Sequence, residues 1–422
     1  MKIKKFFSDK SILQGDAAVW MIFLLLCMVS VIEVYSASSR MTFGTGQYWR
    51  PIVQHGSYIG LGILAAWVIH RIPCNYFKIG GTFVMHLIAY PLLVWAFFAP
   101  KTNDAARWVD MGIIKMQPSE VAKISLVVFS AFILASLRDE KGASGTAFKI
   151  VAVEALLTIM LIAPENASTA GILFLVILGI CFFAQVRTKI LAWIVCAIIG
   201  GGAFALTAAN SIPEETLVEW RKSDSKLLHR AQTWVHRITD KNELPEDPAK
   251  YNLMDNQQVT HATIAVATCN IVGKGPGNSV QRDFLPQAFS DFIYAIIIEE
   301  LGIFGGGGVM FLYLLLMYRA MKIASKCKAL FPSYLVMGLS LMMVVQAMVN
   351  MAVAVGAFPV TGQPLPLISR GGTSIFVNCA YIGMILSVSR SAKKINEGDT
   401  TKKAPDGALG TMESERKTEL VG

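Results

Sequence analysis

Long runs of apolar residues alternate with short polar segments along most of this chain. Because the first run is followed by no clear small-residue cleavage site, we expect it to stay in the protein as a helix and not to act as a signal peptide. Ten runs come close to the roughly 20 residues that an α-helix needs to cross a bilayer. They cover residues 18–36, 56–71, 80–99, 119–137, 148–164, 169–186, 189–209, 300–323, 333–356 and 373–392. The pattern predicts an all-α, polytopic integral membrane protein with ten transmembrane helices.

The polar segments divide the chain into a membrane domain and two tails. Residues 1–17 form a basic tail, and residues 18–392 form the membrane domain, which contains one large loop at 210–290. Within that loop, apolar residues recur at helical spacing over 213–238, so we expect a helix that lies in the membrane interface or packs on the loop itself. Residues 393–422 contain hardly any aliphatic side chains and are predicted to be a disordered tail.

Composition and charge agree with this pattern and orient it. The chain is 54% hydrophobic and 16% charged, which excludes an ordinary soluble protein. Its net charge of +9 comes largely from the tails and the short loops on one side, as the positive-inside rule expects, so a nucleic-acid partner is excluded. Both termini are predicted to be cytoplasmic and the large loop periplasmic. The seven cysteines lack CxxC spacing and predict no disulfide framework and no metal site.

Three carboxylates stand where the eighth apolar run begins. Asp291, Glu299 and Glu300 follow a glycine-rich loop at 273–279. Acids beside hydrocarbon are rare unless they face a cavity or take part in chemistry. Asp291 follows Ser290 at a predicted helix start, so a capping role is an equal alternative on spacing alone. The glycine loop lacks the GxxxxGK[ST] pattern of an ATP-binding loop.

A second charged pair lies at the start of the fourth run. Glu120 and Lys123 are three residues apart and therefore share a helix face. They form either a structural salt bridge or the lining of a water-filled cleft for an anion. Arg107 nearby favours a phosphate or pyrophosphate ligand, because Lys and Arg bind such groups with charge-assisted hydrogen bonds.

The connection before the last run is rich in proline and glycine. Residues 358–374 contain three of each and cannot be helical throughout, and irregular backbone at membrane depth is tolerated where it lines a cavity or is buried. Arg370 and Gly371 offer a cation and backbone N–H groups, a plausible anion nest. In the ninth run, Gln346 and Asn350 are expected to form hydrogen bonds between helices.

Together these stretches resemble the SEDS family of polytopic membrane proteins, over about residues 17–392. The motifs that carry the resemblance are Val34 to Ser38, Arg107-Trp108, Gln117 to Glu120 with Lys123, the loop from Gly273 to Ser279 with Gln281, Leu285-Pro286 followed by Asp291-Phe292, Glu299 to Gly302, and Pro359 to Ser374. The chain departs from the family pattern at Gln287, Phe289, Ala167 and Arg370. These departures put the roles of those positions in doubt, and not that of Asp291.

The resemblance implies an activity and a site. It implies a peptidoglycan glycosyltransferase of the inner membrane that polymerises lipid II, with Asp291 as the general base and a divalent cation, Mg²⁺ or Mn²⁺, as a candidate cofactor. It implies a monofunctional class B penicillin-binding protein as partner through transmembrane helices. The overall pattern leans toward the division branch of the family, with other divisome proteins at the septum. The substrate-binding residues that it suggests are Arg107, Trp108, Glu120, Lys123, Gly275, Ser279, Gln281, Glu299, Glu300, Arg370, Gly371 and Ser374.

Three alternatives stay open at this point. The motifs are shared with the elongation branch of the family, so an elongation-type polymerase is one alternative. A bundle with buried charges could instead transport lipid II across the membrane, or serve as a scaffold that recruits a transpeptidase.

Overall fold

The computed structural model describes residues 13–38, 49–98, 109–110, 115–140, 142–212, 216, 235, 257–285 and 288–403. The described chain is almost entirely helical. The long helices are α1 (Ala17–Ala37), α3 (Arg50–Ile69), α6 (Pro118–Ser136), α7 (Gly145–Ile162), α8 (Ala167–Phe183), α9 (Thr188–Asn210), α13 (Ile293–Ser325), α14 (Leu330–Ala354) and α15 (Gly372–Lys403).

Shorter elements complete the bundle. One apolar stretch is divided into α4 (Asn75–Val84), the π-helical turn η2 (Met85–Ala89) and α5 (Tyr90–Phe98). The helix α12 (Gln257–Ala267) and the 3-10 turn η4 (Gln281–Asp283) precede α13. Two antiparallel hairpins pair β1 (Val109–Asp110) with β2 (Lys115–Met116) and β3 (Arg138–Asp139) with β4 (Gly142–Ala143).

The predicted all-α membrane fold is confirmed, whereas the count of ten spans is not. Among the described residues, 8 helices are long and apolar enough to cross a membrane. The sixth and seventh predicted spans correspond to shorter apolar helices, Ala167–Phe183 and Thr188–Phe204. The helix expected at 213–238 lies outside the described residues, apart from the isolated positions 216 and 235.

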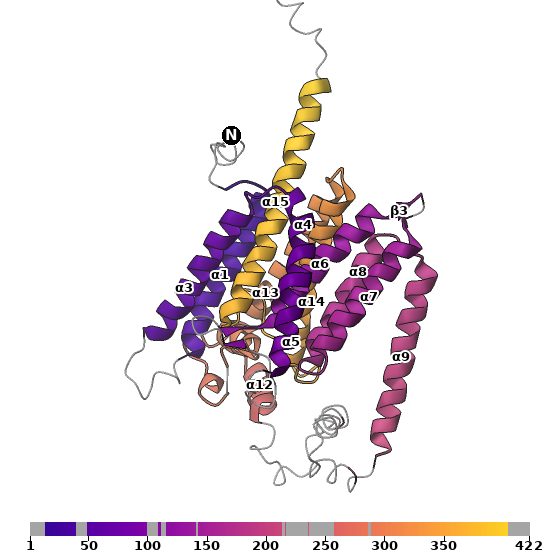
Figure 1. Ribbon diagram of the computed structural model, residues 1–422. Helices are drawn as coiled ribbons and strands as arrows, with labels where there is room; N and C mark the ends of the chain where they lie inside the picture. Colours follow the sequence, from indigo (N-terminus) through magenta and orange to yellow (C-terminus); the bar gives the residue numbers. More distant parts are fainter. Residues whose placement is uncertain are drawn as a thin grey trace, which may run out of the picture.

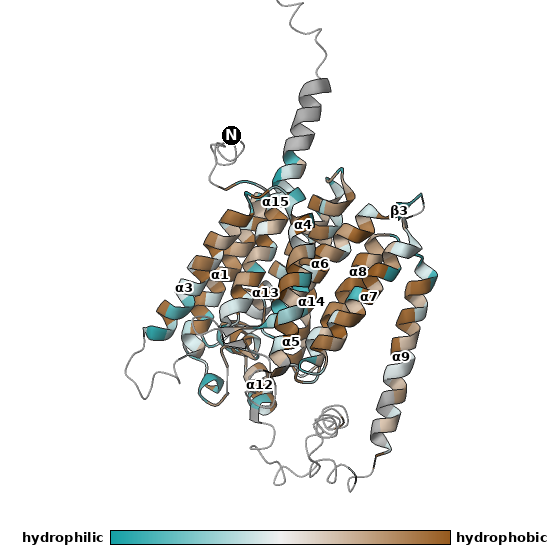
Figure 2. Ribbon diagram, viewed as in Figure 1, coloured by the Kyte–Doolittle hydropathy of each residue, from teal (hydrophilic) through white to brown (hydrophobic). Residues whose placement is uncertain are grey.

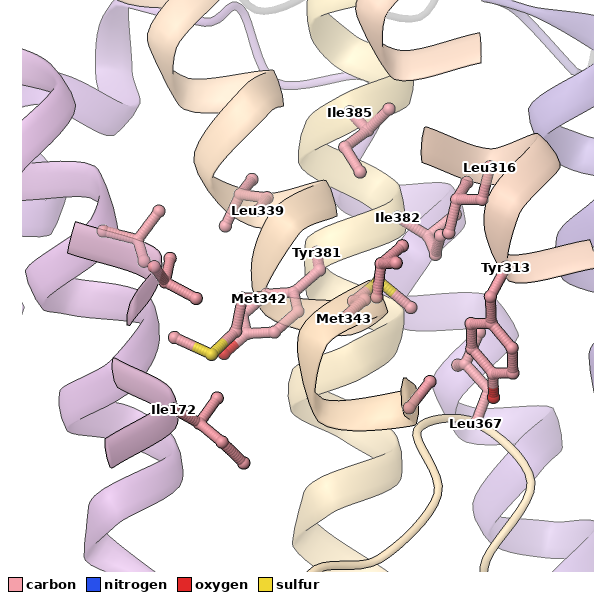
Figure 3. Packing of buried hydrophobic residues seen from close by; sticks show 14 of the residues in the cluster. Ile172, Tyr313, Leu316, Leu339, Met342, Met343, Leu367, Tyr381, Ile382 and Ile385 are labelled. Atoms are coloured by element: carbon pink, nitrogen blue, oxygen red, sulfur yellow. The ribbon is translucent and has the colours of Figure 1, made fainter. Parts of the chain in front are cut away.

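Helix α14 is the centre of the bundle. It packs against α6, α8, α13 and α15, and 72% of its apolar 18-residue stretch is buried. Figure 3 shows Met342 and Met343 of α14 among buried side chains that include Tyr381 of α15 and Tyr313 of α13. Gly338 of α14 permits close approach, because an added Cβ there would lie 2.7 Å from Ile180 of α8. Small residues at such contacts are typical of packing between membrane helices.

The ends of the bundle are polar and its flanks are apolar (Figure 2). The start of α1 and the far end of α15 lie at the same end of the molecule (Figure 1), where Arg390 donates a hydrogen bond of 3.3 Å to Gln14. Helix α9 stands apart at the edge of the bundle and contacts α8.

The eighth span begins earlier than the hydropathy pattern predicts. We expected it to start at residue 300, but α13 begins at Ile293, because the apolar residues before Glu299 continue the helix. Gly302 interrupts α13 with φ 72° and ψ −172°, a conformation that L side chains rarely adopt. Glu299 and Glu300 therefore close a short first segment of α13 and do not lie at the entry of the long one.

Helix α15 also extends past its predicted end at residue 392. It continues to Lys403, two residues before Pro405, the first proline after the span. The residues beyond Lys403, where a disordered tail is predicted, lie outside the described part of the chain.

Candidate active site

Asp291 lies one residue before the N-cap of α13. The N-cap is Phe292, whose own side chain makes no capping hydrogen bond, and the capping role that spacing alone allowed for Asp291 remains a prediction. The Asp291 side chain is partly exposed, and its Oδ1 accepts a hydrogen bond of 2.8 Å from the Ser290 hydroxyl. Because the far end of α13 meets the start of α1 through Arg319 and Asp16, the carboxylate before Ile293 lies at the opposite end of the bundle, where a substrate could reach it.

The segment that carries Asp291 is held by hydrogen bonds to three of its successive backbone carbonyls. The carbonyl of Phe289 accepts from the backbone N–H of Arg370 at 2.9 Å. The carbonyl of Ser290 accepts from the Ser369 hydroxyl at 2.6 Å, and that of Asp291 from Asn350 Nδ2 at 2.8 Å. All three donors come from α14 or from the connection before α15. The hydrogen bond from Asn350 therefore joins α14 to the candidate acid's own backbone, outside any helix. The hydrogen bond between helices that was expected in this run is made by Gln346, which accepts from Lys123 of α6.

The same connection is tied to the rest of the bundle. Gln363 donates 2.8 Å and 3.1 Å hydrogen bonds to Thr169 and Asn166 at the start of α8. Asn350 Nδ2 also donates to the Gln363 carbonyl at 2.7 Å. These contacts attach the connection at Gln363 to α8 and α14, and so help to fix its position beside Asp291.

Arg370 stands next to the Asp291 segment. Its guanidinium lies 5.3 Å from the centre of the Phe289 ring and donates to Gln54 at 2.8 Å. Burial lowers the pKa of this guanidinium from its usual high value, and an arginine stays charged at neutral pH. Gly371 precedes the first turn of α15, and Ser374 is buried there. Neither Gly371 nor Gly372 has a positive φ, so any anion site here would use the N–H groups of the helix start and not a left-handed nest.

The glycine loop and the two glutamates form one structural unit. Gly273, Gly275 and Gly277 have φ near +80°, which turns the loop around the end of the first segment of α13. Glu300 accepts hydrogen bonds from the backbone N–H groups of Gly277 at 2.9 Å and Ser279 at 3.2 Å.

Glu299 is held in the same way. It accepts from the N–H groups of Val280 and Gln281, from the Ser279 hydroxyl, and from Lys274 Nζ at 2.5 Å. Both glutamates are 0% exposed. Their carboxylates occupy the donors that the sequence suggested for substrate, and the substrate-binding roles of Gly275, Ser279, Gln281 and the two glutamates remain predictions.

Glu120 and Lys123 lie inside the bundle and face each other. Lys123 Nζ donates to Glu120 at 2.7 Å and to Gln346 of α14 at 2.9 Å, and the two charged side chains are 2% and 1% exposed. Gln346 in turn donates to the Pro364 carbonyl at 3.0 Å. The structure therefore brings this pair together as a salt bridge that braces the Pro-rich connection. The proposed role in lining an anion-binding cleft remains a prediction.

Two polar residues that sequence reasoning passed over belong to this region. Arg282 Nη1 donates to the Ser36 hydroxyl of α1 at 3.0 Å and lies 3.8 Å from Glu300. Glu33, one turn before Ser36, is 0% exposed, and neither of its carboxylate oxygens has a hydrogen-bond partner among the described residues. A charged residue within the first apolar run was the signal that could have identified Glu33.

Some predicted site residues cannot be placed. Arg107 and Trp108 lie outside the described residues. Within the described ranges, no three His, Cys, Asp or Glu side chains come together in a way that could hold a metal ion. The divalent cation suggested by the resemblance therefore remains a prediction and would need further ligands from a substrate diphosphate.

Comparison with known proteins extends over nearly the whole chain. Residues 16–394 match the family FtsW/RodA/SpoVE, described as "Cell cycle protein". A protein of Nitrosococcus halophilus named "Probable peptidoglycan glycosyltransferase FtsW" is 30% identical, over 92% of this chain and 96% of its own length. A protein of the same name from Coxiella burnetii is 28% identical, over 90% of this chain and 98% of its own length.

Solved structures share the fold. A chain from "Structural coordination of polymerization and crosslinking by a peptidoglycan synthase complex" superimposes with a TM-score of 0.67 at 20% identity, over 90% of this chain and 98% of that one. The rod shape determining protein RodA of Thermus thermophilus gives 0.59 at 18% identity, over 89% and 97% of the two chains. At 18–20% sequence identity, this similarity establishes a shared fold and nothing more.

Proposed function

We infer that this chain, which belongs to the FtsW/RodA/SpoVE family, is a peptidoglycan glycosyltransferase that joins lipid II units into glycan strands. The family match over residues 16–394 and the names of the curated relatives support the activity. The observation that carries the proposal is the partly exposed Asp291, whose backbone is held at three successive carbonyls at one end of a membrane bundle.

The proposed reaction needs one base and one stabilised leaving group. A sugar hydroxyl oxygen attacks the anomeric carbon of a second lipid II, and the bond between that carbon and the diphosphate breaks. Asp291 takes the proton of the attacking hydroxyl, a role that a fixed carboxylate can perform. The diphosphate leaves with its lipid chain.

A cation beside the acid would stabilise the leaving diphosphate. Arg370 fits this role, because its backbone and ring contacts both go to Phe289, two residues from Asp291. Charge-assisted hydrogen bonds to phosphate oxygens suit a guanidinium. We include Arg107 and a diphosphate-bound Mg²⁺ or Mn²⁺ in the proposal as further counter-charges, and Lys123 if its contact with Glu120 opens.

The proposal also covers location and partner. The chain would lie in the inner membrane with both termini in the cytoplasm, and Asp291 would face the periplasm, where lipid II is polymerised. The names of the relatives favour the division branch and hence the septum. A class B penicillin-binding protein is the proposed partner, because one structural neighbour comes from a peptidoglycan synthase complex that coordinates polymerization and crosslinking.

Purified protein with labelled lipid II, alone and with its cognate class B penicillin-binding protein, tests the proposal. We expect glycan polymer from the native chain and a loss of about 10²- to 10⁴-fold in rate for Asp291→Ala, the range that acid–base catalysis contributes. Asp283→Ala is the matched control, because Asp283 is a half-exposed acid in the same outer segment. Runs with Mg²⁺, Mn²⁺ and EDTA test the cation.

Specific outcomes would reject the enzyme. Absence of polymer under every condition, together with movement of lipid II between leaflets of a vesicle, would indicate a transporter. Polymer formation at the native rate by a folded Asp291→Ala would remove Asp291 from the mechanism. Depletion in cells separates the branches, since loss of a division enzyme gives filaments and loss of an elongation enzyme gives rounded cells.

A further inference from the structure

A basic cavity lies at the end of the bundle where α1 begins, far along α13 from Asp291. Its volume is about 470 Å³, and it is formed by the residues just before α1, the last turns of α13 and the outer part of α15. The charged side chains that line it are Asp16, Arg319, Lys322, Lys326 and Lys393. With four basic side chains and one acidic side chain, the lining of the cavity has a net positive charge.

The acid in the cavity has a structural use. Asp16 caps α1, accepting from the backbone N–H groups of Ala18 and Val19 at 2.9 Å and 3.2 Å. It also accepts a hydrogen bond from Arg319 Nη2. This pairing leaves Arg319 Nε buried without a hydrogen-bond partner among the described residues. A buried guanidinium N–H without a partner is unusual and indicates that an acceptor belongs nearby.

A second, apolar cavity lies next to the first. It also measures about 470 Å³ and shares Gly15 and Ala17 with the basic cavity. It runs along the outer face of α1 as far as Met28, and three of its lining side chains, Met21, Leu24 and Met28, are exposed by 54%, 43% and 54%.

The length of this groove matches one leaflet of a membrane. From Ala17 to Met28 the helix rises about 16 Å, at 1.5 Å per residue. Half of a hydrocarbon core of about 30 Å is close to that length. An acyl chain that starts at the basic cavity would therefore reach the bilayer midplane along α1.

We propose that these two cavities together bind one anionic glycerophospholipid, with its phosphate in the basic cavity and an acyl chain in the groove on α1. Basic pockets between membrane helices are suited to anionic headgroups. Free phosphate would use only the cationic half of this site, and an acidic peptide would leave the apolar groove unfilled. The adjacency of the two cavities, which share Gly15 and Ala17, favours the lipid over both.

Native mass spectrometry of the full-length chain in detergent tests the proposal. We expect saturable retention of dioleoyl phosphatidylglycerol and little retention of dioleoyl phosphatidylcholine. The double variant K322Q/K326Q should lower the affinity about 25-fold, since each basic side chain near an anionic lipid contributes about fivefold. The control R187Q/K189Q removes two exposed charges from the start of α9 and should bind like the native chain.

A second set of measurements tests the groove and identifies other ligands. Leu24→Trp, which fills the groove, should weaken binding of dioleoyl phosphatidylglycerol but not of its dihexanoyl counterpart. The proposal is overturned if inorganic phosphate or a deca-glutamate peptide competes as well as the lipid does. Equal lipid retention by native chain and K322Q/K326Q would also overturn it. Binding is the only readout, so the result does not depend on polymerase activity.

Discussion

Three hydrogen bonds to consecutive carbonyls determine how firmly Asp291 is held. A carboxylate that acts as a base must stay within hydrogen-bond reach of the proton it removes, so its backbone has to be fixed in place. The Asn350 amide bridges the Asp291 and Gln363 carbonyls at 2.8 Å and 2.7 Å. At the scale of single residues, Asn350 therefore positions the candidate acid without approaching substrate.

Asn350→Ala should reduce kcat more than it raises KM. Loss of the bridge frees the Asp291 backbone, and a misplacement of about 1 Å can reduce a rate roughly 100-fold. Initial rates over a range of lipid II concentrations measure the split. Ser340→Ala is the control, because this buried hydroxyl on the same helix donates to carbonyls of α14. A kcat within about twofold of the native value would contradict the positioning role.

Replacing glutamate by glutamine should have opposite effects on stability at Glu33 and at Glu300. Glu33 is buried without a hydrogen-bond partner among the described residues, so its charged form is costly and Glu33→Gln should keep or raise the melting temperature. Glu300 accepts hydrogen bonds from Ser36, Gly277 and Ser279. A glutamine there would place its NH₂ group, which can only donate, beside groups that also donate. Glu300→Gln should destabilise by about 2–3 kcal/mol. Thermal unfolding of both variants in one detergent compares them, and equal shifts would refute this interpretation.

At the scale of elements, the kink in α13 and the glycine loop depend on each other. Gly302 lets the chain change direction while Lys274 and Gly275 donate backbone hydrogen bonds to the carbonyls of Glu299 and Glu300 at 3.0 Å and 2.8 Å. A straight helix would leave no free carbonyls at this point. The kink thus creates the acceptors to which the loop is attached.

Gly302→Ala should destabilise the protein strongly. Its φ is positive, and an added Cβ would lie 2.3 Å from the Ile271 carbonyl oxygen and 2.5 Å from the Gly273 nitrogen. Backbone strain of this kind costs about 1–3 kcal/mol before the steric clash is counted. Gly307→Ala is the matched control: no heavy atom lies within 4 Å of its added Cβ, and it should gain about 0.5–1 kcal/mol of helix propensity. Unfolding temperatures measure both, and a tolerated Gly302→Ala would show that the loop does not need the kink.

At the scale of the whole molecule, the two ends of the bundle differ in chemistry. One end carries the start of α1, the outer part of α15 and a cavity lined by four basic side chains, and the other carries Asp291 and the glycine loop. Basic residues are enriched on the cytoplasmic side of membrane proteins, so the first end is expected to face the cytoplasm.

Cysteine labelling tests this orientation. In a background without Cys196, Cys269 and Cys327, which are the free cysteines that are not fully buried, a membrane-impermeant maleimide is added to spheroplasts. Val272→Cys, at a position 78% exposed beside the glycine loop, should react, and Ser325→Cys at the other end should react only after lysis. The reverse pattern would invert the topology and with it the proposed periplasmic chemistry.

Properties that depend on neighbouring residues could be predicted from the chain alone. Apolar runs of spanning length predict membrane helices because each such helix satisfies its own backbone hydrogen bonds. Pro118 and Ser119 start α6 as their local preferences suggest, and Asp291 stands directly before the N-cap of α13. A helix start at Asp291 was predicted from the sequence, but the kink of α13 was not, since Gly302 turns the chain through contacts with Ile271 and Gly273 in the preceding loop.

Contacts between residues that are far apart in the sequence depend on the tertiary structure alone. Lys123 and Gln346 are separated by 223 positions, and no local pattern could show that they meet. The family resemblance suggested Gly275, Ser279 and Gln281 as substrate-binding residues, yet in the folded chain Glu299 and Glu300 reach the glycine loop from the next helix and accept from its backbone N–H groups. A buried carboxylate must find donors somewhere, and only the packing of the helices determines which ones it finds.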